Sequence, residues 1–126
     1  MNVLIDTSVW VEHFKKRNDT LIHLIEMDLA LTHPMVLGEL ACGTPPAPRS
    51  QTLGDIELLK AAYQASLQEV MAFIEANKLY GLGCGLIDMH LLASTIITPD
   101  TSLWTYDKCL NKLADKLNIA YQSNLH

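Results

Sequence analysis

The sequence predicts an α/β fold in which a central parallel sheet of four or five short strands is covered by helices on both faces. Apolar runs such as residues 3–5 have the length of a fully buried strand and are too short for a helix. Longer segments with a helical spacing of apolar residues lie between these runs. Strands that alternate with helices require crossover connections, and such connections produce a parallel sheet with helices on both sides.

The expected strands are residues 3–5, 29–31, 63–65, 103–105 and 119–121. The first ends directly at Asp6, and a helix is expected to start right after it. The fourth follows Pro99, which ends a long apolar helix. The last would lie at an edge of the sheet. Each expected strand is only three residues long.

Seven helices are expected to alternate with these strands, over residues 8–14, 20–27, 34–43, 52–62, 66–77, 86–97 and 107–117. Asp19 is a natural cap for the second helix, and Pro34 suits the first turn of the third. Ser66 and Glu69 have the spacing of a capping box, in which each side chain bonds the other residue's amide. The segment 43–51 is rich in helix breakers and is expected to be a surface loop.

The composition is typical of a compact globular chain that lacks a basic surface. Hydrophobic residues make up 49% of the 126 residues and charged residues 18%, which excludes a disordered protein and favours a single domain over residues 1–126. The formal charge of −5, with only nine Lys and Arg residues, argues against wrapping a nucleic-acid duplex by bulk electrostatics. A nucleic-acid substrate would have to be held in another way.

The cysteine and hydropathy patterns indicate a cytoplasmic protein. Cys42, Cys84 and Cys109 include no close pair, so neither a disulfide framework nor a CxxC site is predicted. No apolar run approaches the ~18 residues that a bilayer crossing needs, and the N-terminus lacks the pattern of a signal peptide. We therefore expect a reducing, cytoplasmic environment and no membrane association.

Four acidic residues stand in apolar surroundings: Asp6 in LIDTS, Glu39 in VLGEL, Asp88 in LIDMH and Asp107 in WTYDK. Asp6 and Asp107 follow expected strands, and the carboxyl ends of parallel strands meet at one edge of a sheet. Each aspartate alone could instead be a helix cap, whereas Glu39 lies in mid-helix, where only a solvated face would explain it. Because burying an acid is costly, we expect the four to share one crevice.

Such a crevice would need a cation. Two ionised carboxylates about 5 Å apart repel by roughly 3 kcal/mol at an effective dielectric constant near 20, and a helix N-terminus offsets only about 1 kcal/mol of this. Either some of the acids are protonated or a divalent cation binds. Oxygen ligands without paired His or Cys favour Mg²⁺, with Mn²⁺ as an alternative, over zinc. Such an ion also engages phosphates, which would let an acidic protein bind RNA.

Four motifs, in this order and spacing, resemble the PIN-domain ribonucleases and in particular the VapC-type toxins of toxin-antitoxin pairs. They are LIDTSVW at residues 4–10, VLGELACG at 36–43, GLGCGLIDMHLLAS at 81–94 and LWTYDKCL at 103–110. The resemblance implies a PIN-like three-layer α/β/α sandwich and a metal-dependent endoribonuclease in the cytoplasm. It also implies an antitoxin of VapB type as partner and a homodimer.

The resemblance also implies roles for particular residues. Asp6 and Asp88 would be the most direct Mg²⁺ ligands, and Glu39 and Asp107 would act through water or a second ion. The hydroxyls of the site would orient carboxylates or water, and they belong to Thr7, Ser8 and Thr105. The basic residues Lys15, Lys16 and Arg17 would either contact RNA phosphates or form a simple polar turn.

Two other functions are compatible with the same residues. A noncatalytic PIN-fold module would bind RNA or protein without cleavage, although no acid of the set is missing. An aspartyl phosphatase would use Asp6 as its nucleophile, but that class usually has a second Asp two residues further on, where this chain has Ser8.

The expected products of the ribonuclease carry 5′-phosphate and 3′-hydroxyl ends.

Overall fold

The computed structural model describes residues 1–122 of the chain. These residues form three strands, β1 (Asn2–Ile5), β2 (Ala30–Leu31) and β3 (Thr101–Trp104). They also form seven helices, α1 (Thr7–Lys15), α2 (Asp19–Glu26), α3 (Pro34–Cys42), α4 (Arg49–Glu57), α5 (Leu67–Ala76), α6 (Leu86–Ile97) and α7 (Lys108–Lys116). Within residues 1–122, no helix has the length and apolar character that a bilayer crossing needs.

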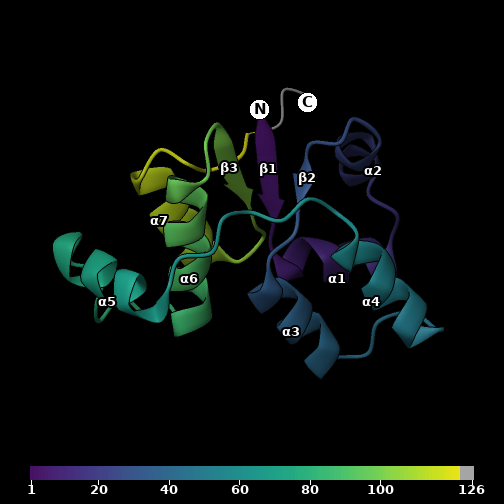
Figure 1. Ribbon diagram of the computed structural model, residues 1–126, viewed down its shortest axis with the longest axis horizontal. Coiled ribbons are helices and arrows are strands. Elements are labelled where there is room, and N and C mark those ends of the chain that lie inside the picture. Colours follow the sequence, from purple (N-terminus) through teal and green to yellow (C-terminus); the bar gives the residue numbers. More distant parts are fainter. Residues whose placement is uncertain (123–126) are drawn as a thin grey trace.

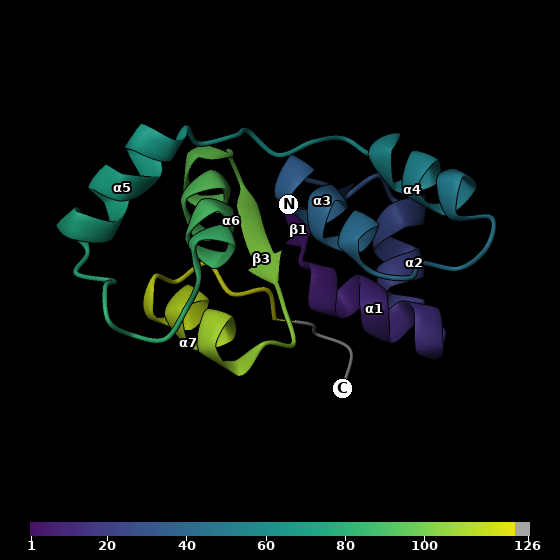
Figure 2. The same ribbon diagram turned by 90° about the horizontal axis from the view of Figure 1, so that it is seen from below.

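The three strands form one parallel sheet in the order β2-β1-β3. β1 pairs with β3 along its whole length, from Asn2 opposite Thr101 to Ile5 opposite Trp104. Helices α1 to α4 gather on the β2 side of the strands and α5 to α7 on the β3 side (Figures 1 and 2). The predicted α/β class with a central parallel sheet is therefore confirmed.

The predicted number of four or five strands is wrong, because the described residues form three. The segment expected as a strand at 119–121 contributes one isolated bridge, Ala120 to Leu103, and a second bridge joins Thr32 to Ala61, just before the segment expected at 63–65. Beyond Ala61, backbone amides donate hydrogen bonds to side-chain hydroxyls and not to the carbonyls of a neighbouring strand. Tyr63 N donates to Thr98 Oγ1 at 2.9 Å and Ala65 N to a second hydroxyl at 3.2 Å, so pairing stops there.

The core explains the apolar runs of the sequence. Three consecutive residues of β1, Val3 to Ile5, are fully buried, as expected for a central strand that is covered on both faces. The largest fully buried side chains from the rest of the chain include Leu21, Leu31, Leu79, Leu91, Leu92, Leu103 and Leu110. They pack the helices of both sides against the sheet.

Helix boundaries follow the capping residues closely. α6 has the predicted bounds, and the capping box of Ser66 and Glu69 is formed at the start of α5. α2 begins one residue earlier than expected, because Asn18 and not Asp19 is its cap. α4 also begins early, inside the segment predicted as a loop, and it ends at Glu57. It stops there because the residues from Lys60 onward bond to Thr32 in extended pairing.

The absence of a disulfide, predicted from the cysteine spacing, is also wrong. Cys84 and Cys109, 25 residues apart, form a disulfide with a Cα–Cα separation of 6.1 Å. The fold brings the loop before α6 against the first turn of α7, a contact that sequence spacing does not reveal. Cys42 remains free and is exposed at the end of α3.

Candidate active site

Asp6 is the buried centre of the candidate site. It follows β1 directly and is 5% exposed. The hydroxyls of Ser8 and Thr105 each donate a hydrogen bond to Asp6 Oδ2, both at 2.7 Å. Ser8 N also points at this oxygen, at 3.4 Å, which makes Asp6 the cap of α1. Residues after β1 and after β3 therefore fix the same carboxylate oxygen.

Glu39 projects from α3 toward the start of α1. Thr7 Oγ1 donates a hydrogen bond of 2.7 Å to Glu39 Oε1. Burial raises the pKa of Glu39, the Thr7 hydrogen bond opposes this, and the negative charges of Asp6 and Asp88 raise the pKa further. The net effect is a raised pKa, which shows that the fold brings this mid-helix acid into the electrostatic field of two other acids.

Asp88 and Asp107 stand at the starts of two helices. Gly85 N donates to Asp88 Oδ2 at 3.2 Å, and Leu110 N donates to Asp107 Oδ1 at 2.9 Å. Burial raises the pKa of Asp88, the Gly85 amide opposes this, and the charges of Asp107 and Asp6 raise the pKa further. The two aspartates thus act as helix caps and interact electrostatically as well.

The four carboxylates share one pattern of hydrogen bonding. In each, one oxygen accepts hydrogen bonds from the protein. The other oxygen accepts none from any described residue. The oxygens in use are Asp6 Oδ2, Glu39 Oε1, Asp88 Oδ2 and Asp107 Oδ1. Fixed carboxylates that each keep one oxygen without such a bond and that interact electrostatically are suitable ligands for a hard divalent cation.

The donor set fits Mg²⁺ or Mn²⁺ better than zinc, since it consists of oxygen atoms. Within residues 1–122, no three His, Cys, Asp or Glu side chains are close enough together to hold a metal ion between them directly. Mg²⁺ usually keeps several of its waters and binds one or two carboxylates, so a spread set of acids is compatible with it. The assignment of the four acids as metal ligands stays a prediction.

The hydroxyl residues lie where they can orient these acids. Thr105 Oγ1 donates to Asp6 and accepts a hydrogen bond of 3.0 Å from Asp107 N, so one hydroxyl contacts two of the four acidic residues. Ser8 Oγ likewise donates to Asp6 and accepts from Tyr106 N at 2.9 Å. The loop after β3 is thereby held against the start of α1.

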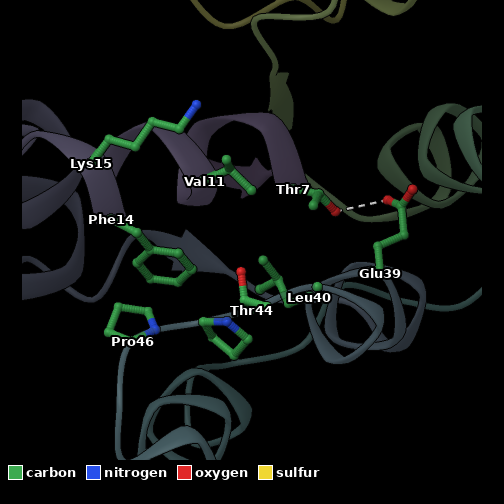
Figure 3. Close-up of a pocket in the computed structure, with 10 residues that line it drawn as sticks. Thr7, Val11, Phe14, Lys15, Glu39, Leu40, Thr44 and Pro46 are labelled. Carbon is green, nitrogen blue, oxygen red and sulfur yellow. Dashed lines mark hydrogen bonds between the residues drawn. The ribbon is translucent and has the colours of Figure 1, made fainter.

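An apolar cavity of about 430 Å³ begins beside Glu39. In Figure 3 the Thr7–Glu39 hydrogen bond closes one end of the cavity, and Phe14 and Pro46 lie toward the other end. Its lining comes from α1, α3 and the following loop: Thr7, Val11, Phe14, Lys15, Glu39, Leu40 and residues 43–46. No sequence pattern predicted this cavity, because α1 and the proline-rich loop meet only in the folded chain.

The three basic residues proposed to contact RNA are placed differently. Lys15 is exposed and lines the cavity beside the acidic site. Lys16 is exposed and follows α1 as its C-cap. Arg17 pairs with Asp19 at 3.0 Å on the surface. Lys15 is thus the basic residue of this group that lines the same cavity as Glu39, at the end where Phe14 lies (Figure 3).

Comparisons with known proteins agree with this geometry. No family model matches the chain. It is 34% identical over 121 residues to Ribonuclease VapC32 of Mycobacterium tuberculosis, in the strains CDC 1551 / Oshkosh and H37Rv, and the match covers 94% of both chains. The structure of VapBC-1 from nontypeable Haemophilus influenzae contains a chain with the same fold, with a TM-score of 0.69, 12% identity and 98% coverage of both chains. The fold is therefore that of the PIN domain, and the chain belongs to the VapC family of ribonucleases.

Proposed function

We propose that this chain is a divalent-metal-dependent endoribonuclease and the toxin of a VapBC-type pair. Family membership supports RNA hydrolysis. The observation that carries the metal dependence is the shared pattern of the four acids, each with one oxygen fixed by the protein and one left over. Burial raises the pKa of Glu39 and Asp88, and the charges of neighbouring acids raise both pKa values further, so a bound cation would favour the ionised forms of these carboxylates.

In this proposal Asp6 and Asp88 hold Mg²⁺ most directly, and Glu39 and Asp107 act through water or a second ion. When bound, such an ion would supply Lewis-acid chemistry: it would polarise the phosphodiester and lower the pKa of a water molecule placed for attack on phosphorus. Ser8 and Thr105 keep Asp6 in one orientation through their hydrogen bonds to Oδ2. Thr7 does the same for Glu39, and cleavage leaves 5′-phosphate and 3′-hydroxyl ends.

The substrate is RNA, held near the acids with the help of Lys15. The total charge of −5 repels a polyanion, so phosphate binding depends on the bound cation and on nearby amines. Lys15 lines the cavity that starts at Glu39, and its amine can balance the charge of a phosphate on the strand that enters the site. Lys16 lies next to it in the chain and is exposed.

The partner is an antitoxin of VapB type that covers the acidic site and fills the adjoining cavity. The cavity is lined mainly by apolar groups, including Val11, Phe14 and Leu40, and it opens beside the carboxylate of Glu39. This combination suits a peptide with an apolar side chain next to a basic one. Such a peptide would exclude RNA from the acids while it is bound.

Homodimerisation through the α5 side of the molecule completes the proposal. α5 extends at the end of the molecule opposite α4 (Figures 1 and 2). Large apolar side chains are exposed on α5 and at the end of α6: Leu67, Met71, Ile96 and Ile97. An exposed apolar patch of this kind is typical of an interface between protein chains.

The test compares RNA cleavage by Asp88→Asn and Glu39→Gln with that by Asp115→Asn, which changes an exposed acid on α7 outside the four motifs. Loss of a metal ligand should lower the rate by at least about 100-fold, since even residues behind the ligands typically cost 10- to 100-fold. Asp115→Asn should cleave like the natural chain, and EDTA should abolish cleavage by both. RNA binding without cleavage in Mg²⁺ or Mn²⁺ would support the noncatalytic module instead.

A further inference from the structure

The Cys84–Cys109 disulfide joins two segments that each carry an acid of the candidate site. Cys84 immediately precedes Gly85, the cap of α6, whose amide donates to Asp88 Oδ2. Cys109 lies in the first turn of α7, two residues after its cap Asp107. The crosslink therefore connects the starts of α6 and α7 at the position of Asp88 and Asp107.

The loop that carries Cys84 has few other attachments. Three of its residues, Gly81 to Gly83, are exposed, and Gly81 and Gly83 adopt positive φ values of 71° and 88° that favour glycine. Apart from the disulfide, a side-chain contact between this loop and α7 is that of Cys109 Sγ with Leu82 O at 3.5 Å. Even this contact depends on one of the two cysteines.

The like charges of Asp88 and Asp107 repel each other, which favours a larger separation of the two side chains. Both are acids, and the charge of Asp107 raises the pKa of Asp88. The hydrogen bond of Asp107 N to Thr105 connects the start of α7 to β3, while Asp88 depends on the amide of Gly85 for its orientation. A covalent link next to both residues fixes their separation.

We infer that the Cys84–Cys109 pair is a redox-controlled positioning crosslink, which sets the separation of Asp88 and Asp107 and thereby the affinity of the site for its divalent cation. This inference rests on the proposed function, because it takes the two aspartates as metal ligands. Neither cysteine contacts substrate or metal in it. Both act through the helix starts that they join.

The chemical step is thiol–disulfide exchange with a small-molecule disulfide such as glutathione disulfide. One protein thiolate attacks the small disulfide, forms a mixed disulfide and releases one small thiol. The other protein thiolate then attacks the protein sulfur of the mixed disulfide and releases the second small thiol. Two protein thiols are oxidised and one small disulfide is reduced to two thiols, so the reaction is balanced and reversible.

The first measurement follows thiols and Mn²⁺ binding in the full chain without RNA. Reduced protein should show three free thiols, and incubation with glutathione disulfide should leave one, that of Cys42. The dissociation constant for Mn²⁺, measured from the electron paramagnetic resonance signal of the free ion, should be about tenfold lower in the oxidised form, the scale of effects transmitted through residues behind a ligand. Persistence of all three thiols would overturn the inference.

Variants separate positioning from simple stabilisation. Cys84→Ser and Cys109→Ser should bind Mn²⁺ as the reduced protein does, with or without the oxidant, whereas Cys42→Ser should respond like the natural chain. Equal Mn²⁺ affinity in the oxidised and reduced forms, with only the melting temperature lowered on reduction, would show a merely structural disulfide and overturn the inference alone. No Mn²⁺ binding in either form would instead overturn the proposed metal site and the inference with it.

Discussion

Lowering the pH from 7 to 4.5 should weaken the fold through a single buried side chain, His33. This residue is 2% exposed and caps α3, the helix that carries Glu39. Its Nδ1 accepts a hydrogen bond of 3.0 Å from Met35 N, so the proton of the neutral ring lies on Nε2, 2.9 Å from Ser94 Oγ. Protonation of Nδ1 would break the cap.

The magnitude follows from the shift in pKa. Burial, and then the nearby His90, lower the pKa of His33 from 6.5 to about 4. Above pH 6.5 the ring is neutral in both the folded and the unfolded chain, and between 6.5 and 4 the unfolded chain takes up the proton first. Stability is therefore lost as the pH falls through this window, by about 2.5 kcal/mol between pH 7 and pH 4.5.

The assay is urea denaturation of the natural chain and of His33→Asn at both pH values. Asn retains a capping oxygen for α3 but does not titrate. Protonation of carboxylates affects both proteins alike, so the difference between their unfolding free energies isolates the histidine. The unfolding free energy of the natural chain minus that of His33→Asn should fall by about 2.5 kcal/mol on going from pH 7 to pH 4.5. A difference that is the same at both pH values would refute the reasoning.

Three further predictions concern the acid cluster and the two proposed interfaces. RNA cleavage should be lost as the pH falls through the raised pKa of Glu39, and Thr7→Val should move this loss to higher pH, because it removes the hydrogen bond that lowers that pKa, whereas Thr7→Ser should not. Val11→Asp, which places a charge in the cavity, should weaken antitoxin binding by at least about tenfold in a titration. Met71→Lys should convert a dimer to a monomer in light scattering, while Met27→Lys, at a residue equally exposed, should leave the dimer intact.

The buried or partly buried positions of Asp6, Glu39 and Asp88 could be predicted from the sequence because their signals are local. An acid directly after a short apolar run, as at Asp6, marks the end of a buried strand. The apolar neighbours of Glu39 and Asp88 argue against a fully solvated face, and both side chains are half-buried in the structure. The bounds of α6 were predictable for the same reason, since a continuous apolar helix ends shortly before Pro99.

Features that depend on contacts between distant segments escaped sequence reasoning. The strand expected at 63–65 does not form, since its amides bond to the hydroxyls of Ser94 and Thr98, and no local pattern reveals such partners. The Cys84–Cys109 disulfide depends on the path of the loop before α6. The cavity depends on how α1 meets the loop after α3.

The double hydrogen bond to Asp6 has a consequence for the order of events during synthesis. Asp6 is made well before one of the hydroxyls that orient it, which belongs to Thr105, 99 positions later. β1 is also the middle strand, and its pairing with β3 waits for residues 101–104. The hydrogen bond that orients Asp6 and the complete sheet therefore form only after residues 101–105 have left the ribosome.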